Sequence, residues 1–146
     1  MDIRRILVAV DIAHSSEPLA EYAQILAEKL DARLIVLYVT RDMEELESLY
    51  MPHISVEKVQ KEIIDSARSE LSTFCDTHFG GRIEYEVVIR TGDAYREIND
   101  IIPELNVDLV VMGTHGTKGL DRFFFGSTAE RVLRSVPCPV LTVKLM

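Results

Sequence analysis

The stretch VDLVVMGTHGTKGLDRFFFGSTAERV, residues 107–132, carries the strongest indication of how the chain folds. Its apolar run Leu109–Met112 predicts a buried strand, and Ser127 is placed to begin a helix. Three glycines divide the intervening loop: Gly113, Gly116 and Gly126. Glycine lets the backbone approach a ligand, and the free N–H groups at a helix start attract phosphate. The stretch therefore predicts a phosphate-binding loop, with a spacing that is neither Walker A nor Gly-x-Gly-x-x-Gly.

The rest of the chain alternates between strand and helix patterns. Five strands are expected, at residues 6–10, 33–39, 83–87, 107–112 and 140–145. Four helices are expected between them: from Ser15 or Ser16 to Leu30, and near residues 56–74, 93–103 and 127–136. This alternation predicts one doubly wound α/β domain over residues 1–146, with parallel strands.

Several details of these elements can also be predicted. The first helix is expected to bury Leu19, Tyr22, Ala23, Leu26 and Leu30, which recur at helical spacing. The strand near residues 83–87 alternates between apolar and polar residues, so we expect it at a half-exposed edge of the sheet. Residues 41–55 have no regular pattern and are interpreted as an excursion with a short acidic helix.

Charge and cysteine content exclude several classes of function. The net charge of −8 argues against general nucleic-acid binding and against docking on an anionic membrane. No apolar run is long enough to span a bilayer, and no signal peptide opens the sequence, which favours the cytoplasm. Cys75 and Cys138 lack metal-ligand spacing, as do the histidines, so no metal site is expected.

The glycine stretch, the opening ILVAVD and the closing CPVLTVK together resemble the universal stress protein family, in its ATP-binding branch. The resemblance covers essentially the whole chain. It implies an adenine nucleotide alpha hydrolase-like fold, a five-stranded parallel sheet of order 3-2-1-4-5 with helices on both faces. In that order the first and fourth strands are neighbours, and ligands of such sheets sit at this reversal of strand order. Asp11 and Gly113 would then face each other across one crevice.

The candidate site residues follow from the glycine loop and from this resemblance. Asp11 is interpreted either as an acceptor for ribose hydroxyls or the adenine amino group, or as an ordinary loop-closing aspartate. The resemblance implies that the ATP phosphates are surrounded by Gly113, Gly116, Gly126, Ser127 and Thr128. It implies that the base and ribose are lined by Ala9, Val10, Val39 and Met112. Lys118 is either a phosphate partner or a solvated lysine, and His115 is expected to contribute its backbone.

Two positions depart from the family pattern. Ala13 and Ala129 stand where many members carry a hydroxyl, although Thr128 directly precedes the second. Each missing hydrogen bond would cost about 0.5–1.5 kcal/mol, or roughly a three- to tenfold loss of affinity. No dedicated carboxylate for Mg²⁺ is evident, so ATP is expected with or without the metal.

The preferred interpretation is an ATP-binding regulatory stress protein without fast catalysis. The alternatives are a slow ATPase or phosphotransferase, and a nucleotide-free dimeric interaction module. The loop pattern does not distinguish ATP from ADP, AMP or cyclic AMP. An apolar edge strand invites pairing, and the resemblance implies a homodimer through Val140 to Leu145, unless residues 41–55 cover that edge.

Overall fold

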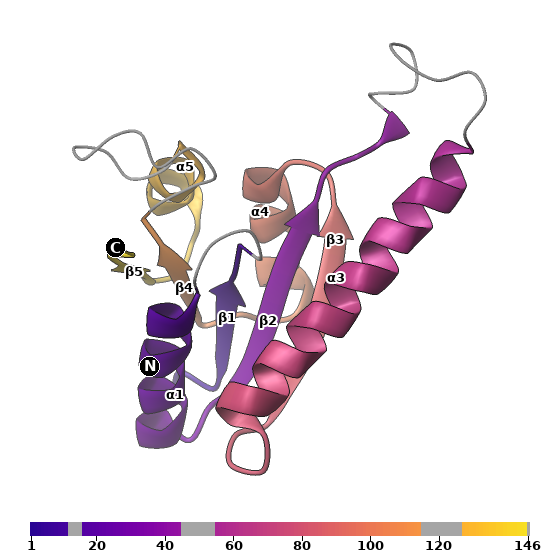
Figure 1. The fold of residues 1–146 in the computed structure, drawn as a ribbon. Coiled ribbons are helices and arrows are strands. Elements are labelled where there is room, and N and C mark those ends of the chain that lie inside the picture. Colours follow the sequence, from indigo (N-terminus) through magenta and orange to yellow (C-terminus); the bar gives the residue numbers. More distant parts are fainter. Residues whose placement is uncertain (12–15, 45–54, 115–126, 146) are drawn as a thin grey trace.

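Five parallel strands form a single sheet in the computed structural model, which describes residues 1–11, 16–44, 55–114 and 127–145 (Figure 1). The strands are β1 (Arg5–Ala9), β2 (Arg33–Thr40), β3 (Tyr85–Thr91), β4 (Leu109–Gly113) and β5 (Val140–Val143). The helices are α1 (Glu17–Leu30), α3 (Val56–Phe79), α4 (Ala94–Glu104) and α5 (Ser127–Ser135). The strand order β3-β2-β1-β4-β5 confirms the predicted α/β topology.

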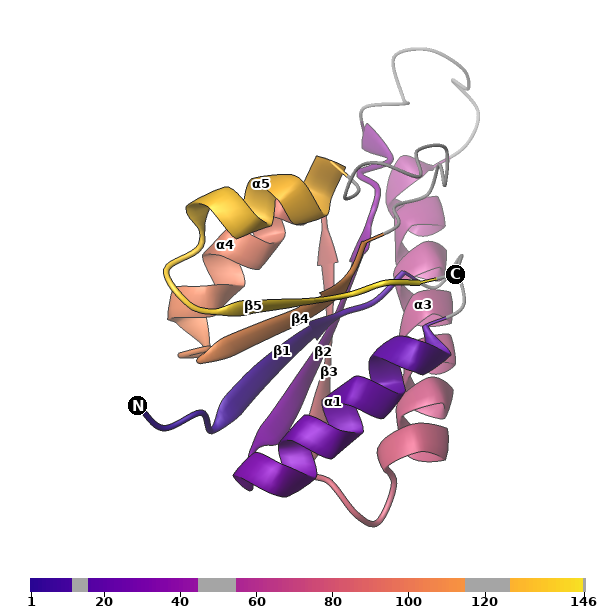
Figure 2. The ribbon, with the colours of Figure 1, turned by 90° about the vertical axis from the view of Figure 1, so that its left-hand side faces the viewer.

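Helices cover both faces of the sheet, as Figure 2 shows. The helices α1 and α3 pack on one face, and α4 and α5 pack on the other, which divides the apolar core into two clusters. The central strand β1 contributes to both, because successive side chains of a strand point to opposite faces. Its residues Ile6, Leu7 and Val8 are fully buried. Continuous apolar runs such as this one are typical of parallel strands covered on both sides.

The buried face of α1 differs from the predicted one. Tyr22 and Leu30 are 52% and 40% exposed, so their assignment to the core was wrong. The buried residues are instead Leu19, Ala20, Ala23 and Ala27. Three alanines on this face bring the helix close to the sheet, and the longer side chains beside them then point outward into solvent.

The helix α3 is longer than predicted, and β3 begins later. The buried stripe of α3 continues from Leu71 through Cys75 to Phe79, at the four-residue spacing of one helix face. Gly80 caps the helix, and the N–H of Ile83 donates to the carbonyl of Phe79. Ile83 therefore belongs to the turn after α3, and the strand expected at residues 83–87 lies at Tyr85–Thr91. Every residue of this strand is partly exposed, as predicted for an edge.

The carboxyl ends of β1, β2 and β4 lie together at one edge of the sheet. Ala9 at the end of β1 is aligned with Leu37 of β2 and with Met112 of β4. The start of α5 faces the same edge, because the chain returns there after β4 (Figure 1). The neighbouring β1 and β4 are where the strand order reverses, so this edge is the expected location of a ligand site.

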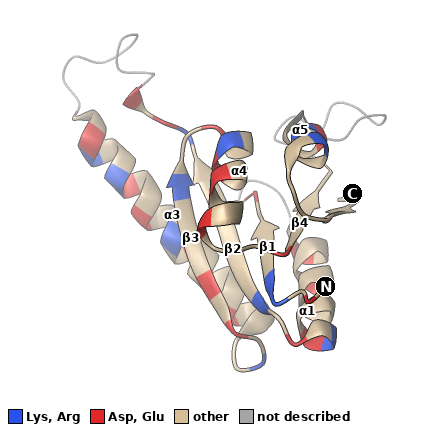
Figure 3. Cartoon of the chain, turned by 180° about the vertical axis from the view of Figure 1, so that it is seen from behind, with Lys and Arg blue, Asp and Glu red and all other residues tan. Residues whose placement is uncertain are grey.

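Among the described residues, no helix is long and apolar enough to cross a membrane. Acidic and basic residues are interspersed along α3 (Figure 3). The same part of the chain contains no group of three or more His, Cys, Asp or Glu side chains arranged to hold a metal ion.

Candidate functional site

A cavity of about 250 Å³ lies at the carboxyl edge of the sheet, between the ends of β1, β2 and β4. Its floor includes Ala9, Val39 and Met112, one residue from each of the three strands. The first turns of α1, α4 and α5 form the walls, so the cavity draws on the helices of both layers. A cavity with an apolar floor and a few polar groups at its rim is the usual form of a small-molecule site.

Asp11 stands on the cavity wall, two residues after the end of β1. Its backbone carbonyl accepts a hydrogen bond of 3.3 Å from the hydroxyl of Ser16, a buried residue that also lines the cavity. Ser16 is the N-cap of α1, as predicted, but its side chain makes no capping bond to the helix. The hydroxyl instead ties the start of α1 to the end of β1, which fixes the position of the Asp11 backbone at the cavity.

Gly113 ends β4, and it lines the same cavity as Asp11. An added Cβ at this position would lie 2.9 Å from Cγ of Leu145 and closer still to its Cδ1, so the leucine side chain would have to shift. Leu145 is buried, lines the cavity and follows β5. The glycine therefore serves the packing of the chain end against β4, a role that the loop pattern did not predict.

The start of α5 supplies the wall on the β4 side of the cavity. Thr128 and the buried Ala129 line it within the first turn of the helix, where backbone N–H groups lack partners in the helix itself. This end of a helix carries partial positive charge and is suited to an anion. The start of α4 contributes Ala94 and Ile98 to the neighbouring wall.

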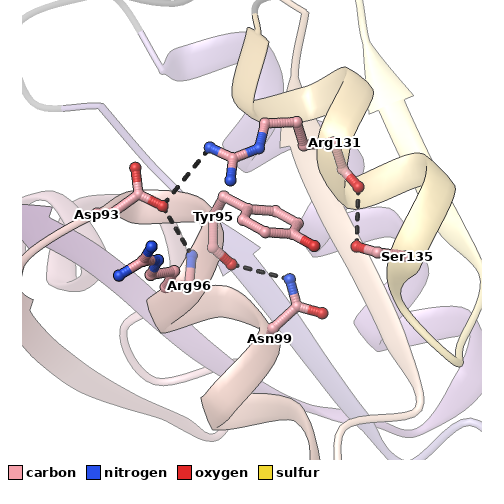
Figure 4. Close-up of polar contacts among 6 residues, drawn as sticks. All are labelled: Asp93, Tyr95, Arg96, Asn99, Arg131 and Ser135. Atoms are coloured by element: carbon pink, nitrogen blue, oxygen red, sulfur yellow. Dashed lines mark hydrogen bonds and ion pairs between the residues drawn. The ribbon is translucent and has the colours of Figure 1, made fainter.

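Arg131 joins α5 to the start of α4 (Figure 4). Its guanidinium carbon lies 4.0 Å from the ring centroid of Tyr95, and its Nη1 lies 3.7 Å from the carboxylate of Asp93. Asp93 in turn accepts a hydrogen bond from the backbone N–H of Arg96 and so caps α4. This cluster joins α4, which carries Ala94, to α5, which carries Thr128, and both residues line the cavity.

The β2 side of the cavity contains Tyr38 and Arg41, neither of which was predicted from the sequence. Burial raises the pKa of the Tyr38 hydroxyl, and the negative charges of Asp11 and Glu70 raise it further. The positive charge of Arg41 acts in the opposite direction. Asp11 and Arg41 are thus both close enough to Tyr38 to affect its ionisation.

Seven of the twelve residues predicted for the site line the one cavity: Ala9, Val10, Asp11, Val39, Met112, Gly113 and Thr128. Ser127 begins α5, as predicted. Four others lie outside the described residues: His115, Gly116, Lys118 and Gly126. Ala13, one of the two departures from the family pattern, lies outside them as well. The structure therefore brings together residues from β1, β2, β4 and α5 that are far apart in the sequence.

Comparison with known proteins identifies the family. The chain matches the model of the universal stress protein family over residues 2–144. The chain belongs to the universal stress protein family. Universal stress protein MJ0531 of Methanocaldococcus jannaschii is 30% identical over 143 residues, which cover 97% of this chain and 82% of the relative. Universal stress protein YxiE of Bacillus subtilis is 26% identical over 145 residues, which cover 96% of this chain and 98% of the relative.

Solved structures share the universal stress protein fold over nearly the full length. Hypothetical protein MJ0577 superposes with a TM-score of 0.84 at 20% identity, covering 100% of this chain and 99% of that one. A universal stress protein in complex with cAMP superposes with a TM-score of 0.62 at 20% identity, and 100% of both chains is covered. The universal stress protein of Archaeoglobus fulgidus in complex with dAMP superposes with a TM-score of 0.59 at 20% identity, covering 99% of this chain and 100% of that one. At these identities the likeness establishes the fold.

Nine further residues line the cavity of this universal stress protein, and no motif marks them except Ala129, which stands at a position where many family members carry a hydroxyl. They lie near the carboxyl end of a strand or near the start of a helix: Ser16, Leu19, Leu37, Tyr38, Arg41, Ala94, Ile98, Ala129 and Leu145. Arg41 could have been found, since it directly follows β2 and the carboxyl ends of neighbouring parallel strands meet at one edge. Leu145 could not, because its contact with Gly113 depends on the path of the chain after β5.

Proposed function

We propose that this chain is a regulatory stress protein that binds ATP in the cavity at the carboxyl edge of the sheet and does not turn it over rapidly. The observation that carries the proposal is the position of that cavity. It lies where β1 and β4 meet, at the reversal of strand order, with the first turn of α5 as one wall. Open α/β sheets bind nucleotides at such a point, with phosphate at a helix start.

The walls of the cavity are suited to the parts of an adenine nucleotide. Val39 and Met112 offer apolar contacts to a base, and Asp11 offers carboxylate oxygens to ribose hydroxyls. Thr128 and the N–H groups of α5 lie on the opposite side of β1 from β2, where the phosphates would extend. The two related structures in complex with cAMP and dAMP support an adenine nucleotide as the ligand.

Slow turnover is part of the proposal. Phosphoryl transfer needs a positioned nucleophile or base and stabilised charge on the transferred group. Within the described walls of the cavity, the only carboxylate is that of Asp11, and we assign it to the ribose. Mg²⁺ would then be held mainly by the phosphates and by water, as is common for this ion. The cytoplasmic location expected from the sequence stays a prediction.

The decisive experiment has two steps. Freshly purified protein is denatured in acid and its nucleotide content is measured, and stripped protein is then titrated with ATP by calorimetry. We expect copurified ATP or saturable ATP binding. The Asp11→Asn variant, which keeps the shape of the side chain but removes its charge, should bind several-fold more weakly because its hydrogen bonds to ribose would no longer be charge-assisted.

Each other outcome points to a different function. Copurified ADP, with phosphate release by the wild type well above that of Asp11→Asn, would favour the slow ATPase. No copurified nucleotide and no binding at millimolar ATP would reject the proposal and leave an interaction module. Asp11→Asn is preferable to a Gly113 variant as the control, because Gly113 also packs against Leu145.

A further inference from the structure

Arg41 is a charged residue on the cavity wall that no known motif assigns. It directly follows β2 and lies on the β2 side of the cavity. Asp11 and Arg41 are the charged side chains among the described residues that line the cavity. Arg41 makes no hydrogen bond or ion pair with another residue in the described ranges, whereas Arg33, Arg90 and Arg131 each pair with a carboxylate. Its guanidinium is therefore available to a ligand.

A hydrogen-bond network fixes the chain on both sides of Arg41. The buried hydroxyl of Thr40 lies 2.9 Å from the hydroxyl of Thr91 on β3. The side chain of Gln60 on α3 donates to Thr40 Oγ1 at 3.4 Å and accepts from the N–H of Met43 at 2.8 Å. Gln60 thus bridges the residues directly before and two places after Arg41. The backbone that carries the arginine is held at the rim of the cavity.

The position of β2 determines which part of a nucleotide Arg41 would contact. The strand β1 lies between β2 and β4, so the ends of β2 and β4 are about 10 Å apart, two strand spacings. The phosphates are expected on the β4 and α5 side, and the base is expected near Val39 on the β2 side. A guanidinium offers N–H donors to the ring nitrogens of a purine and can also stack on its face.

We propose that Arg41 is a binding residue of this cavity, where its guanidinium contacts the base of the bound adenine nucleotide, and that Gln60 positions it there. The inference rests on the proposed function and deepens it. Arg41 should contribute to the affinity for every ligand that carries the base, independent of the number of phosphates. It should contribute nothing to the binding of a phosphate chain alone.

The test compares four ligands: ATP, AMP, adenosine and inorganic triphosphate. Each is titrated into the full-length wild type, into Arg41→Gln and into Arg68→Gln. Arg68 is an exposed arginine on α3 outside the cavity walls, so its variant has the same net charge as Arg41→Gln. We expect Arg41→Gln to lower the affinity for ATP, AMP and adenosine by a similar factor. This factor should be about fivefold, as for the loss of a cation–π contact of about 1 kcal/mol. Triphosphate binding should be as strong as in Arg68→Gln.

The positioning role of Gln60 is tested by Gln60→Met, which keeps the length of the side chain but removes its hydrogen bonds. In the wild-type background this substitution should lower the affinity for the three base-containing ligands. In the Arg41→Gln background it should lower that affinity little further. Equal losses in the two backgrounds would show that Gln60 acts on the fold alone and would overturn its assignment. Thermal unfolding of each variant checks that the fold is retained.

Other outcomes separate the inference from the proposed function. A loss that grows with the number of phosphates, including weaker triphosphate binding, would place Arg41 on the phosphates and overturn the base contact. ATP binding that is unchanged in Arg41→Gln would overturn the inference while leaving the nucleotide site in place. A wild type that binds none of the ligands would overturn the proposed function, and this inference with it.

Discussion

The thiol of Cys75 lies on α3 against the sheet, with none of the residue exposed. Burial raises its pKa from the usual 9.0 to about 12, and the nearby charge of Asp76 contributes. The thiolate is the nucleophilic form of cysteine, so Cys75 should be inert in the folded protein. The Cys138→Ser variant has Cys75 as its single thiol. We predict that iodoacetamide alkylates this thiol at pH 8 at a rate no greater than the rate of protein unfolding. Mass spectrometry after timed quenching measures this rate.

The same shift predicts how stability depends on pH. The thiol stays protonated in the folded state and ionises above pH 9 in the unfolded state, so its contribution is fully present below pH 9. That contribution is lost as the pH rises towards 12, with a slope of at most about 1.4 kcal/mol per pH unit. Denaturant unfolding of the wild type and of Cys75→Ala at pH 8 and 10 checks the sign. Equal pH slopes in the two proteins would contradict the assignment.

Single residues of the site could be predicted where a strand end or a glycine marks them. Asp11 is an example, because it closely follows a strand that the periodicity predicts, and it lines the cavity. Thr128 lines the cavity as well, but it was selected through the family resemblance. The long side chains were less predictable. Tyr22 fits the helical period of α1 but is exposed, since the neighbouring alanines bring the helix too close to the sheet to cover it.

Two elements, β4 and the chain after β5, meet at the contact between Gly113 and Leu145. A methyl group at Gly113 would overlap the leucine side chain, so we predict that Gly113→Ala destabilises the protein by about 1–3 kcal/mol. In a Leu145→Ala background the overlap disappears. The same substitution should then be neutral or stabilising, because alanine restricts the unfolded chain more than glycine does.

Denaturant unfolding of the two single variants and the double variant measures this coupling. An equal loss in both backgrounds would mean that the destabilisation does not arise from the contact with Leu145. Nucleotide titration of the same proteins separates stability from binding, since both residues also line the cavity.

The lengths of elements were harder to predict than their existence. The strand β3 was placed too early because the alternation around Ile83 continues into the turn that closes α3. Pairing with β2 determines its true extent, from Tyr85 beside Leu34 to Thr91 beside Thr40. Such pairing joins residues about fifty positions apart, and local periodicity contains no information about it.

At the scale of the whole molecule, the two edges of the sheet differ. The edge strand β3 carries Glu86 and Arg90, charged residues that discourage pairing with another chain. The other edge strand, β5, has the sequence VLTV. The carbonyls of Pro139 and Val143 accept hydrogen bonds from β4 and the following loop. Since backbone groups alternate in direction, those of Val140 and Thr142 point away from β4. This geometry supports the proposed homodimer through β5.

We predict that the wild type has the mass of two chains by light scattering at micromolar concentration. Thr142→Pro should convert it to a monomer, because proline removes an outward N–H without disturbing the bonds to β4. Thr142→Val keeps the N–H and serves as the matched control. A monomeric wild type would refute the homodimer, and a dimeric Thr142→Pro would place the interface elsewhere.

The two layers of helices both contribute to the cavity, through Leu19 of α1 and Ile98 of α4. A bound nucleotide would therefore contact both halves of the core, and we expect it to stabilise both of them against unfolding. At a ligand concentration of one hundred times Kd, the free energy of global unfolding rises by about 2.7 kcal/mol. Backbone amides of α1 and α4 that exchange with deuterium through global unfolding should then exchange about a hundredfold more slowly. Slowing confined to one layer would mean that the two layers open separately and that the ligand stabilises only one of them.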